Sequence, residues 1–152
     1  MYSIIVCEDD PTQLHAISTT IKKFVLFHEE DFDNSFSTPN PEKCLDYLKS
    51  HNIQNGIYLL DIDLGTSMNG IDLAEQIRKL DVESEIIFIT SHDEMAPLTL
   101  KRRVEALRFI SKDNSLEKIR DEIYETLNLA RLRSDERKNL KRKIFNFSIG
   151  VR

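Results

Sequence analysis

Short apolar runs alternate along this chain with longer segments in which apolar residues recur every three or four positions. Continuous apolar runs at 57–60 and 86–89 are typical of strands buried on both faces, and the largely apolar runs at 3–7 and 106–110 are further strand candidates. A more polar segment at 32–38 is a weaker strand candidate. Helical spacing follows each run, and after residue 114 it continues towards residue 142. The pattern therefore predicts five strands, each followed by a helix.

This alternation predicts the α/β fold class. Strands that are separated by helices usually form a parallel sheet with helices on both faces. Because right-handed crossovers leave few arrangements, we expect a flavodoxin-like, doubly wound (βα)5 sheet with strand order 2-1-3-4-5 and an extended C-terminal helix. In that order the first and third strands are neighbours, so the residues that follow them meet at one edge of the sheet.

Composition narrows the class of protein. At 152 residues and 40% hydrophobic, the chain fits one ordinary domain with a short remainder. It has no apolar run of about 18 residues and no basic segment leading into an apolar one, so neither a membrane span nor a signal peptide is predicted. Cys7 and Cys44 show no metal-ligand spacing. Isolated cysteines without an export signal indicate reduced thiols and a cytoplasmic location.

Polar residues of particular types stand where the predicted strands end. Glu8 and Asp9 follow the first strand, Asp61 follows the third, Thr90 ends the fourth and Lys112 follows the fifth. Clustered carboxylates repel each other unless they share a cation, and Mg²⁺ suits a few carboxylates together with a phosphate oxygen. The set predicts a phosphoryl-transfer site in which Asp61 forms an aspartyl phosphate, while Lys112 and the hydroxyl of Thr90 or Ser91 contact the phosphate.

Each of these residues has a simpler interpretation when it is taken alone. An acid pair after a strand commonly caps the next helix, and Asp10 before Pro11 is such a cap. A lone aspartate is usually a turn former and a lone lysine is usually solvated. The functional interpretation is favoured because the acids, the hydroxyl residue and the lysine all fall at the carboxyl ends of the predicted strands.

Over about residues 2–128 the chain resembles the receiver domain of bacterial two-component response regulators. The resemblance rests on Val6-Cys7-Glu8-Asp9-Asp10, Leu59-Leu60-Asp61, Asn69-Gly70-Ile71, Thr90 and Lys112. It implies a phosphoacceptor signalling domain, not an enzyme, with self-catalysed phosphoryl uptake and hydrolysis. Asp61 would take the phosphoryl group from the histidine of a sensor histidine kinase. Glu8, Asp9 and Asp61 would hold Mg²⁺, and the backbone carbonyl of Asp63 would complete the metal's protein ligands.

The resemblance also implies a switch. Thr90 and Lys112 would read the phosphate, and Phe109 would fill the aromatic switch position, although core packing explains Phe109 equally well. In receivers, the face built from the fourth helix, fifth strand and fifth helix commonly mediates dimerisation. We therefore expect a homodimer through that face, with the charged side chains Arg102, Arg103, Arg108, Glu117 and Asp121 available for ion pairs.

Finer features resemble the LytTR-type quorum-sensing regulators of Gram-positive bacteria, which regulate transcription. These features are Cys7-Glu8-Asp9-Asp10-Pro11, Ile86-Ile87-Phe88-Ile89-Thr90-Ser91-His92 and Phe109-Ile110-Ser111-Lys112-Asp113. The chain departs from the general receiver pattern in two places. Asp113 stands where most receivers have proline, and the loop from Asp61 to Gly70 is one residue longer than usual.

Charge and pattern divide the chain into three parts. Residues 1–130, the expected receiver domain, carry a balance of −11, whereas residues 131–152 carry +6. We interpret 131–143 as a basic helical linker. Residues 144–151 alternate between apolar and polar types like a first strand. We therefore expect 144–152 to be the start of a truncated LytTR-like DNA-binding effector domain, so that DNA is a partner only through the missing part.

Three other functions remain open. Leu59-Leu60-Asp61-Ile62-Asp63 also resembles the Asp-x-Asp motif of haloacid-dehalogenase-type phosphatases, although that family carries it on the first strand. A Toprim-like nucleic-acid module would use Glu8, Asp61 and Asp63 but leaves Thr90 and Lys112 unexplained. A receiver-shaped scaffold would work through contacts alone, without phosphorylation. Repeated turnover of small phosphoesters would identify the phosphatase, and nuclease or primase activity would identify the Toprim-like module. Partner binding that is insensitive to Asp61→Asn would identify the scaffold.

Overall fold

The computed structural model describes residues 1–148, apart from the side chains at positions 34 and 35. Strands and helices alternate along it. The elements are β1 (Tyr2–Cys7), α1 (Pro11–Leu26), β2 (Phe32–Thr38), α2 (Pro41–Ser50), β3 (Ile57–Leu60), α3 (Gly70–Leu80), β4 (Glu85–Thr90), the short 3-10 helix η1 (Asp93–Met95), α4 (Ala96–Lys101), β5 (Arg108–Ser111) and α5 (Leu116–Ser148).

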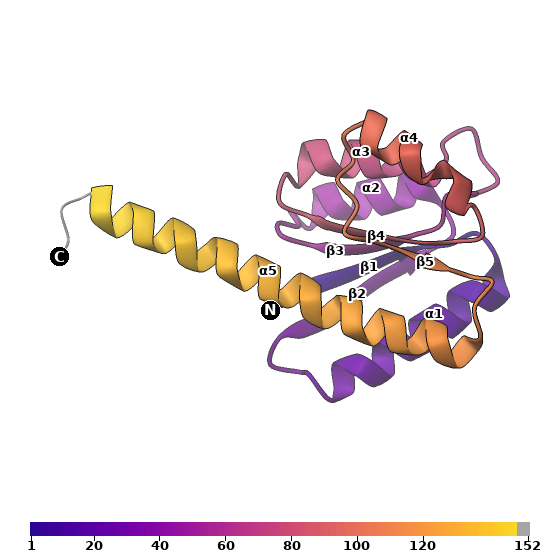
Figure 1. Cartoon of the computed structure of the whole chain (residues 1–152), viewed down its shortest axis with the longest axis horizontal. Helices are drawn as coiled ribbons and strands as arrows, with labels where there is room; N and C mark the ends of the chain where they lie inside the picture. The colour runs from indigo at the N-terminus through magenta and orange to yellow at the C-terminus, as the bar shows by residue number, and fades with distance from the viewer. Residues whose placement is uncertain (149–152) are drawn as a thin grey trace.

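The five strands form one parallel sheet in the order β2-β1-β3-β4-β5, which confirms the predicted fold class and strand order. Figure 1 shows α2, α3 and α4 on one face of the sheet and α1 and α5 on the other. The last helix continues well past the sheet, as the helical spacing after residue 114 predicted, and ends the described part of the chain as a projecting rod.

Two hydrophobic cores lie on the two faces of the sheet. Alternate residues of β1 point into different cores: Ile4 and Val6 pack on the α1 and α5 side, whereas Ile5 and Cys7 pack on the α2 and α3 side. All four are essentially inaccessible to solvent. Burial on both faces explains why the sequence of this strand is continuously apolar instead of alternating.

Polar side chains cap the start of α1, α2 and α3. The Asp10 carboxylate accepts hydrogen bonds from the amides of residues 12 and 13, and the Asn40 side chain does the same at the start of α2. Asn69 and Asp72 form a reciprocal capping box at the start of α3. Asp10 is therefore a cap, as the sequence indicated, and it is separate from the acids that precede it.

Strand register brings the ends of β1, β3, β4 and β5 to one edge of the sheet. Cys7 lies opposite Leu60, and Thr90 lies opposite Ser111. Two backbone hydrogen bonds extend this register past the strand ends: the Asp61 amide donates to the Cys7 carbonyl (3.0 Å) and the Lys112 amide donates to the Thr90 carbonyl (3.1 Å). The residues that directly follow these strands are consequently neighbours in space.

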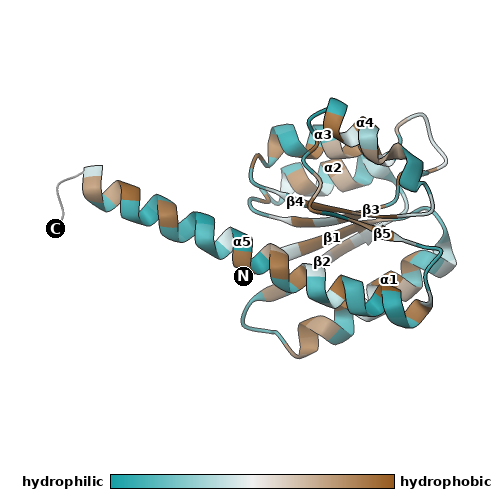
Figure 2. Cartoon of the chain, viewed as in Figure 1, coloured by the Kyte–Doolittle hydropathy of each residue, from teal (hydrophilic) through white to brown (hydrophobic). Residues whose placement is uncertain are grey.

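The C-terminal segment differs from the prediction. Residues 144–148 belong to α5, so the strand predicted over 144–151 is wrong for that part, and residues 149–151 lie outside the described residues. Figure 2 shows isolated hydrophobic positions between hydrophilic ones along this projecting part. A helix satisfies its own backbone hydrogen bonds, whereas a strand at 144–148 has no neighbouring strand in the described part of the chain. No described helix is both long and apolar enough to cross a membrane.

Candidate functional site

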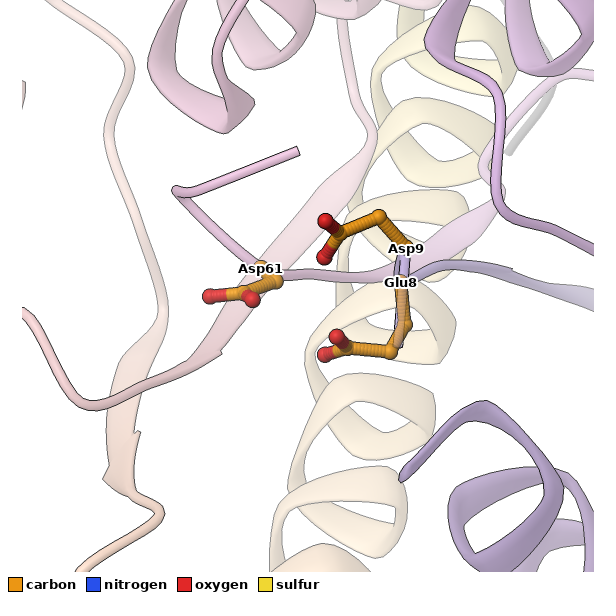
Figure 3. Close-up of side chains that lie close together, drawn as sticks. All are labelled: Glu8, Asp9 and Asp61. Atoms are coloured by element: carbon orange, nitrogen blue, oxygen red, sulfur yellow. The ribbon is translucent and has the colours of Figure 1, made fainter. Parts of the chain in front are cut away.

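Three carboxylates meet at the carboxyl edge of the sheet, as predicted. Glu8 and Asp9 follow β1, Asp61 follows β3, and one oxygen from each lies within 4.8 Å of the others. Figure 3 shows the three side chains turned towards a common space. Glu8 and Asp61 are buried, with 1% and 6% of their surface exposed, while Asp9 is more open to solvent. Two buried acids side by side require a cation, because each raises the cost of charge on the other.

Lys112 supplies one such cation. Its Nζ lies 2.8 Å from Asp61 Oδ2 and 2.7 Å from Glu8 Oε2, so a single ammonium joins both buried acids. Burial alone would lower the pKa of this lysine, but hydrogen bonds to Asp61 and Glu8 raise it above its ordinary value. Lys112 therefore stays charged. The sequence predicted that Lys112 contacts a phosphate carried by Asp61, but it gave no sign of the direct contacts of Lys112 with both Asp61 and Glu8.

Glu8 is the acid whose charge is least favoured. Burial is the main reason that the pKa of Glu8 is raised to about 7. The negative charge of Asp61 also raises this pKa, whereas the hydrogen bond from Lys112 lowers it. Its Oε1 accepts a hydrogen bond from the Asp10 amide at 3.2 Å. Lys112 alone thus leaves Glu8 incompletely neutralised near neutral pH, and a second cation at this edge is favoured.

The backbone around Asp61 is packed closely. Asp61 Oδ1 accepts a hydrogen bond from the following amide, that of Ile62, at 2.7 Å. Gly70, the first residue of α3, donates its amide to the Ile62 carbonyl at 2.7 Å. A Cβ built on Gly70 would lie 1.9 Å from the Asp61 carbonyl oxygen. The requirement for glycine at this position is therefore steric, a reason that spacing along the sequence does not reveal.

An open cavity of about 250 Å³ lies at this edge. It is lined by Glu8, Asp9, Asp10, Gln13, Asp61, Asp63, Ser91, His92 and Lys112. Five of these residues are acidic, and Lys112 is the one lysine or arginine among them. The Asp63 side chain accepts a hydrogen bond from the Gly65 amide at 3.2 Å. The cavity offers room for a small anion only if its negative charge is offset by a cation.

Thr90 lies at the end of β4 but is fully buried, and it is Ser91 that lines the cavity. The Thr90 Oγ1 accepts a hydrogen bond from the His92 amide at 3.1 Å, which leaves its hydroxyl proton available to donate. The His92 ring also lines the cavity and lies 3.0 Å from Glu94, whose hydrogen bond raises the pKa of the imidazole.

Phe109 lies away from this cavity. It is half-buried in β5 and stacks on Phe88 of β4, with ring centroids 5.0 Å apart and an interplanar angle of 26°. Core packing thus accounts for its position in this conformation, and the switch role stays a prediction. Of the charged residues on the expected dimer face, Arg102 pairs with Asp72 and Glu75 inside the chain. Arg108 pairs with Glu125.

The donor set fits a magnesium ion. Mg²⁺ binds oxygen ligands, commonly one or two carboxylates with retained waters and a phosphate oxygen. Glu8, Asp9 and Asp61 provide carboxylate oxygens close enough to share one ion. The strongly acidic lining of the cavity is the chemical reason to expect a divalent cation there.

Comparison with known proteins agrees with this geometry. The response regulator receiver domain matches residues 4–124, most of the chain. Accessory gene regulator protein A of Staphylococcus aureus is 41% identical over 130 residues, which cover 86% of this chain and 54% of that protein. The corresponding protein of Staphylococcus epidermidis is 41% identical over 114 residues, or 75% of this chain and 48% of its own length. The chain thus spans about half the length of these relatives.

Solved structures support the fold. The response regulatory domain of protein mrkE from Klebsiella pneumoniae superimposes with a TM-score of 0.69 at 22% identity, covering 86% of this chain and 98% of that one. A LuxR-family DNA-binding response regulator from Staphylococcus aureus gives 0.67 at 23% identity, covering 86% and 99%. With the family match over 4–124 and the acidic triad, the resemblance inferred from the sequence is confirmed: the chain belongs to the response regulator receiver domains.

Proposed function

We propose that this chain receives a phosphoryl group on Asp61 from the phosphohistidine of a sensor histidine kinase, in a magnesium-dependent reaction. Membership of the receiver family supports a phosphoacceptor signalling module rather than a classical enzyme. The observation that carries the assignment is the position of Lys112 Nζ, within 2.8 Å of both Asp61 and Glu8. One carboxylate is thereby placed beside a cation and next to the acids that would hold the metal.

The reaction forms one bond and breaks another. A carboxylate oxygen of Asp61 attacks phosphorus, the P–N bond of the phosphohistidine breaks, and the imidazole leaves with the electron pair of that bond. Lys112 stabilises the negative charge on the phosphoryl oxygens, and the Thr90 hydroxyl donates to one of them. Glu8, Asp9, Asp61 and the Asp63 carbonyl would hold Mg²⁺, which would supply positive charge to shield the entering phosphoryl group.

The output of the domain follows from the change in charge. Phosphorylation gives Asp61 about one more negative charge and new acceptor oxygens, so Thr90 and Lys112 are drawn towards it. We propose that this shift, with Phe109 responding, promotes a homodimer through α4, β5 and α5. The match to accessory gene regulator proteins supports a role in quorum sensing and transcription. DNA would be contacted by a LytTR-like domain that begins near residue 144, after a linker at 131–143, and the location would be cytoplasmic.

Intact mass measurement after incubation with acetyl phosphate and Mg²⁺ tests the assignment. The wild-type chain should gain about 80 Da, one phosphoryl group, with release of acetate. Asp61→Asn should gain nothing. Asp63→Asn is a matched control, because it makes the same chemical change two residues away and keeps the backbone carbonyl that is proposed to bind the metal.

Other outcomes identify the alternatives. Repeated turnover of small phosphoesters would indicate a haloacid-dehalogenase-like phosphatase, and cleavage or synthesis of nucleic acid would indicate a Toprim-like module. A wild-type chain that gains no mass, and whose partner binding is unaffected by Asp61→Asn, would indicate a scaffold that works without phosphorylation.

A further inference from the structure

The basic part of α5 does not extend freely from the domain. After its sheet-covering turns, α5 passes the base of the sheet, which is the amino-terminal edge opposite the candidate site, and then projects away from the body (Figure 1). Residues 131–141 belong to this part of the helix. Their charged side chains contact acids of the receiver body there. These contacts join Arg131 to Asp31, Arg133 and Arg137 to Glu85, and Lys141 to Glu83.

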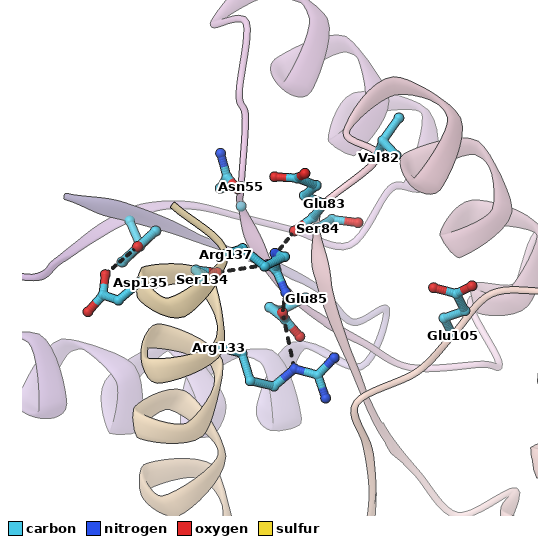
Figure 4. A network of polar contacts seen from close by, with 12 residues as sticks. Asn55, Val82, Glu83, Ser84, Glu85, Glu105, Arg133, Ser134, Asp135 and Arg137 are labelled. Carbon is cyan, nitrogen blue, oxygen red and sulfur yellow. Dashed lines mark hydrogen bonds and ion pairs between the residues drawn. The ribbon is translucent and has the colours of Figure 1, made fainter. Parts of the chain in front are cut away.

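Glu85, the first residue of β4, is the centre of these contacts. Only 3% of its surface is exposed. Its Oε1 lies 2.6 Å from Arg137 Nη1 and 3.5 Å from Arg133 Nε. Figure 4 shows both arginine side chains reaching this carboxylate from α5. A buried carboxylate needs a partner cation, and the helix supplies it.

The Arg137 guanidinium donates hydrogen bonds to three different groups at once, which a lysine ammonium could not do in the same geometry. Its Nη2 donates to the Glu83 carbonyl at 2.9 Å and to the Ser134 hydroxyl at 3.0 Å, while Nη1 holds Glu85. Ser134 itself is fully buried. The planar guanidinium therefore joins α5 to the backbone and to a side chain at the start of β4 in one fixed geometry.

A second anchor lies at the start of β1. The Tyr2 hydroxyl donates to Asp135 Oδ1 at 2.5 Å, and Lys138 Nζ lies 4.2 Å from the centre of the Tyr2 ring. The ring of Tyr2 is part of the core between the sheet and α1 and α5. Because Tyr2 and Glu85 belong to different strands, α5 is held at two separate points and cannot pivot about either one.

We propose that residues 131–141 form a clasp that locks α5 onto the base of the sheet, so that the receiver and this part of the helix move as one rigid body. The clasp fixes the direction in which the chain leaves the receiver. The excess positive charge of this segment is explained by the acids it meets on the receiver, without a nucleic-acid partner. The proposal is independent of phosphorylation of Asp61.

Amide hydrogen exchange on the full 152-residue chain tests the clasp. In the wild type, the amides of residues 131–141 should exchange much more slowly than the amides of an isolated helix. Arg137→Met should raise their exchange by roughly tenfold or more, because it removes the closer of the two cations that pair with the buried Glu85 and leaves only Arg133 at 3.5 Å. Arg137→Lys should give an intermediate increase, since charge remains but the fork of hydrogen bonds is lost.

Two comparisons keep the result interpretable. Glu117→Gln, a charge removal on an exposed part of the same helix, should leave exchange of 131–141 unchanged. The exchange rates of peptides from β1 and β3 show whether the sheet of a variant is still folded. If Arg137→Met also raises the exchange of β1 and β3, the Glu85→Gln variant becomes the test of the clasp. This substitution removes the negative charge of residue 85 but keeps an oxygen that accepts hydrogen bonds. Wild-type residues 131–141 that exchange like a free helix, or that are unaffected by both Arg137→Met and Glu85→Gln, would overturn the proposal.

Discussion

At the scale of single residues, the position of Asp61 depends on a neighbour that has no side chain. Gly70 begins α3 directly against the Asp61 carbonyl, where a Cβ would approach to 1.9 Å of backbone that cannot yield easily. We expect Gly70→Ala to destabilise the fold by about 1–3 kcal/mol, as overpacking does, and to slow phosphoryl uptake by shifting Asp61. Urea unfolding and the time course of mass gain with acetyl phosphate measure the two effects.

A neighbouring substitution separates strain from simple loss of stability. Asn69 caps α3, and Asn69→Ala should cost about 1 kcal/mol without pushing on the Asp61 carbonyl. Uptake in Asn69→Ala should therefore remain close to that of the wild type. Equal rates in Gly70→Ala and Asn69→Ala would show that the contact at Gly70 does not position Asp61, the proposed phosphoacceptor.

The same scale shows what the sequence can and cannot reveal about the site. Glu8, Asp9, Asp61 and Lys112 could be located because each lies within two residues of the end of an apolar run, and parallel strands end at one edge. The bridge from Lys112 to Glu8 and the burial of Thr90 depend on register and side-chain direction. Those quantities are set by the packed sheet and leave no trace in residue spacing.

At the scale of secondary-structure elements, Arg78 joins three segments whose contact residue spacing did not indicate. Its half-buried guanidinium donates to the carbonyls of Val82 and Ser84 before β4 and to those of Val104 and Glu105 before β5. Burial lowers the pKa of this arginine, yet the carbonyls around it need its donors.

Arg78→Met should therefore destabilise the fold. Its side chain fills a similar volume but leaves several carbonyl oxygens without a partner, and we expect a loss of about 2–4 kcal/mol. Lys79→Met is the matched control, because Lys79 is the next residue on α3 and is exposed. It should change stability by less than about 0.5 kcal/mol. Similar unfolding midpoints for the two variants would contradict this role for Arg78.

Element boundaries were predicted most closely for two strands of different character. The buried apolar run at 57–60 coincides with β3, and the more polar segment at 32–38 coincides with the edge strand β2. The last strand was predicted at 106–110 and is found at 108–111. The preceding loop places Arg103 and Glu105 at positive φ, which delays the start of the ladder although Ala106 and Leu107 are apolar. Alternation at 144–148 indicated a strand, but the segment continues the helix that the clasp holds.

At the scale of the whole molecule, charge is distributed unevenly between the two edges of the sheet. At the base, acids of the receiver are paired with the basic residues of α5. At the opposite edge, five acids line one cavity with a single lysine. The base is thus neutralised from within the chain, whereas the site edge carries an excess of negative charge that only a cation from solution can offset.

This imbalance predicts that Mg²⁺ stabilises the folded protein, and more strongly at pH 8 than at pH 6. Because the pKa of Glu8 is raised to about 7, its contribution to stability without metal is present at low pH and is lost as pH rises through 7. Metal ligands must be deprotonated, so binding has the opposite dependence. At pH 6 most molecules carry a proton on Glu8, which weakens Mg²⁺ binding roughly tenfold relative to pH 8.

The size of the effect follows from mass action. With Mg²⁺ at about ten times its dissociation constant at pH 8, the free energy of unfolding should rise by about 1.4 kcal/mol, against about 0.4 kcal/mol for the same concentration at pH 6. For a domain of this length the larger value corresponds to a shift in Tm of roughly 3–6 °C. Thermal unfolding with and without the ion at both pH values measures it. Asp46→Asn, which removes an exposed acid on α2, should keep both increments, whereas Asp9→Asn should lose them. Equal increments at the two pH values would mean that Glu8 is not the residue whose proton competes with the metal.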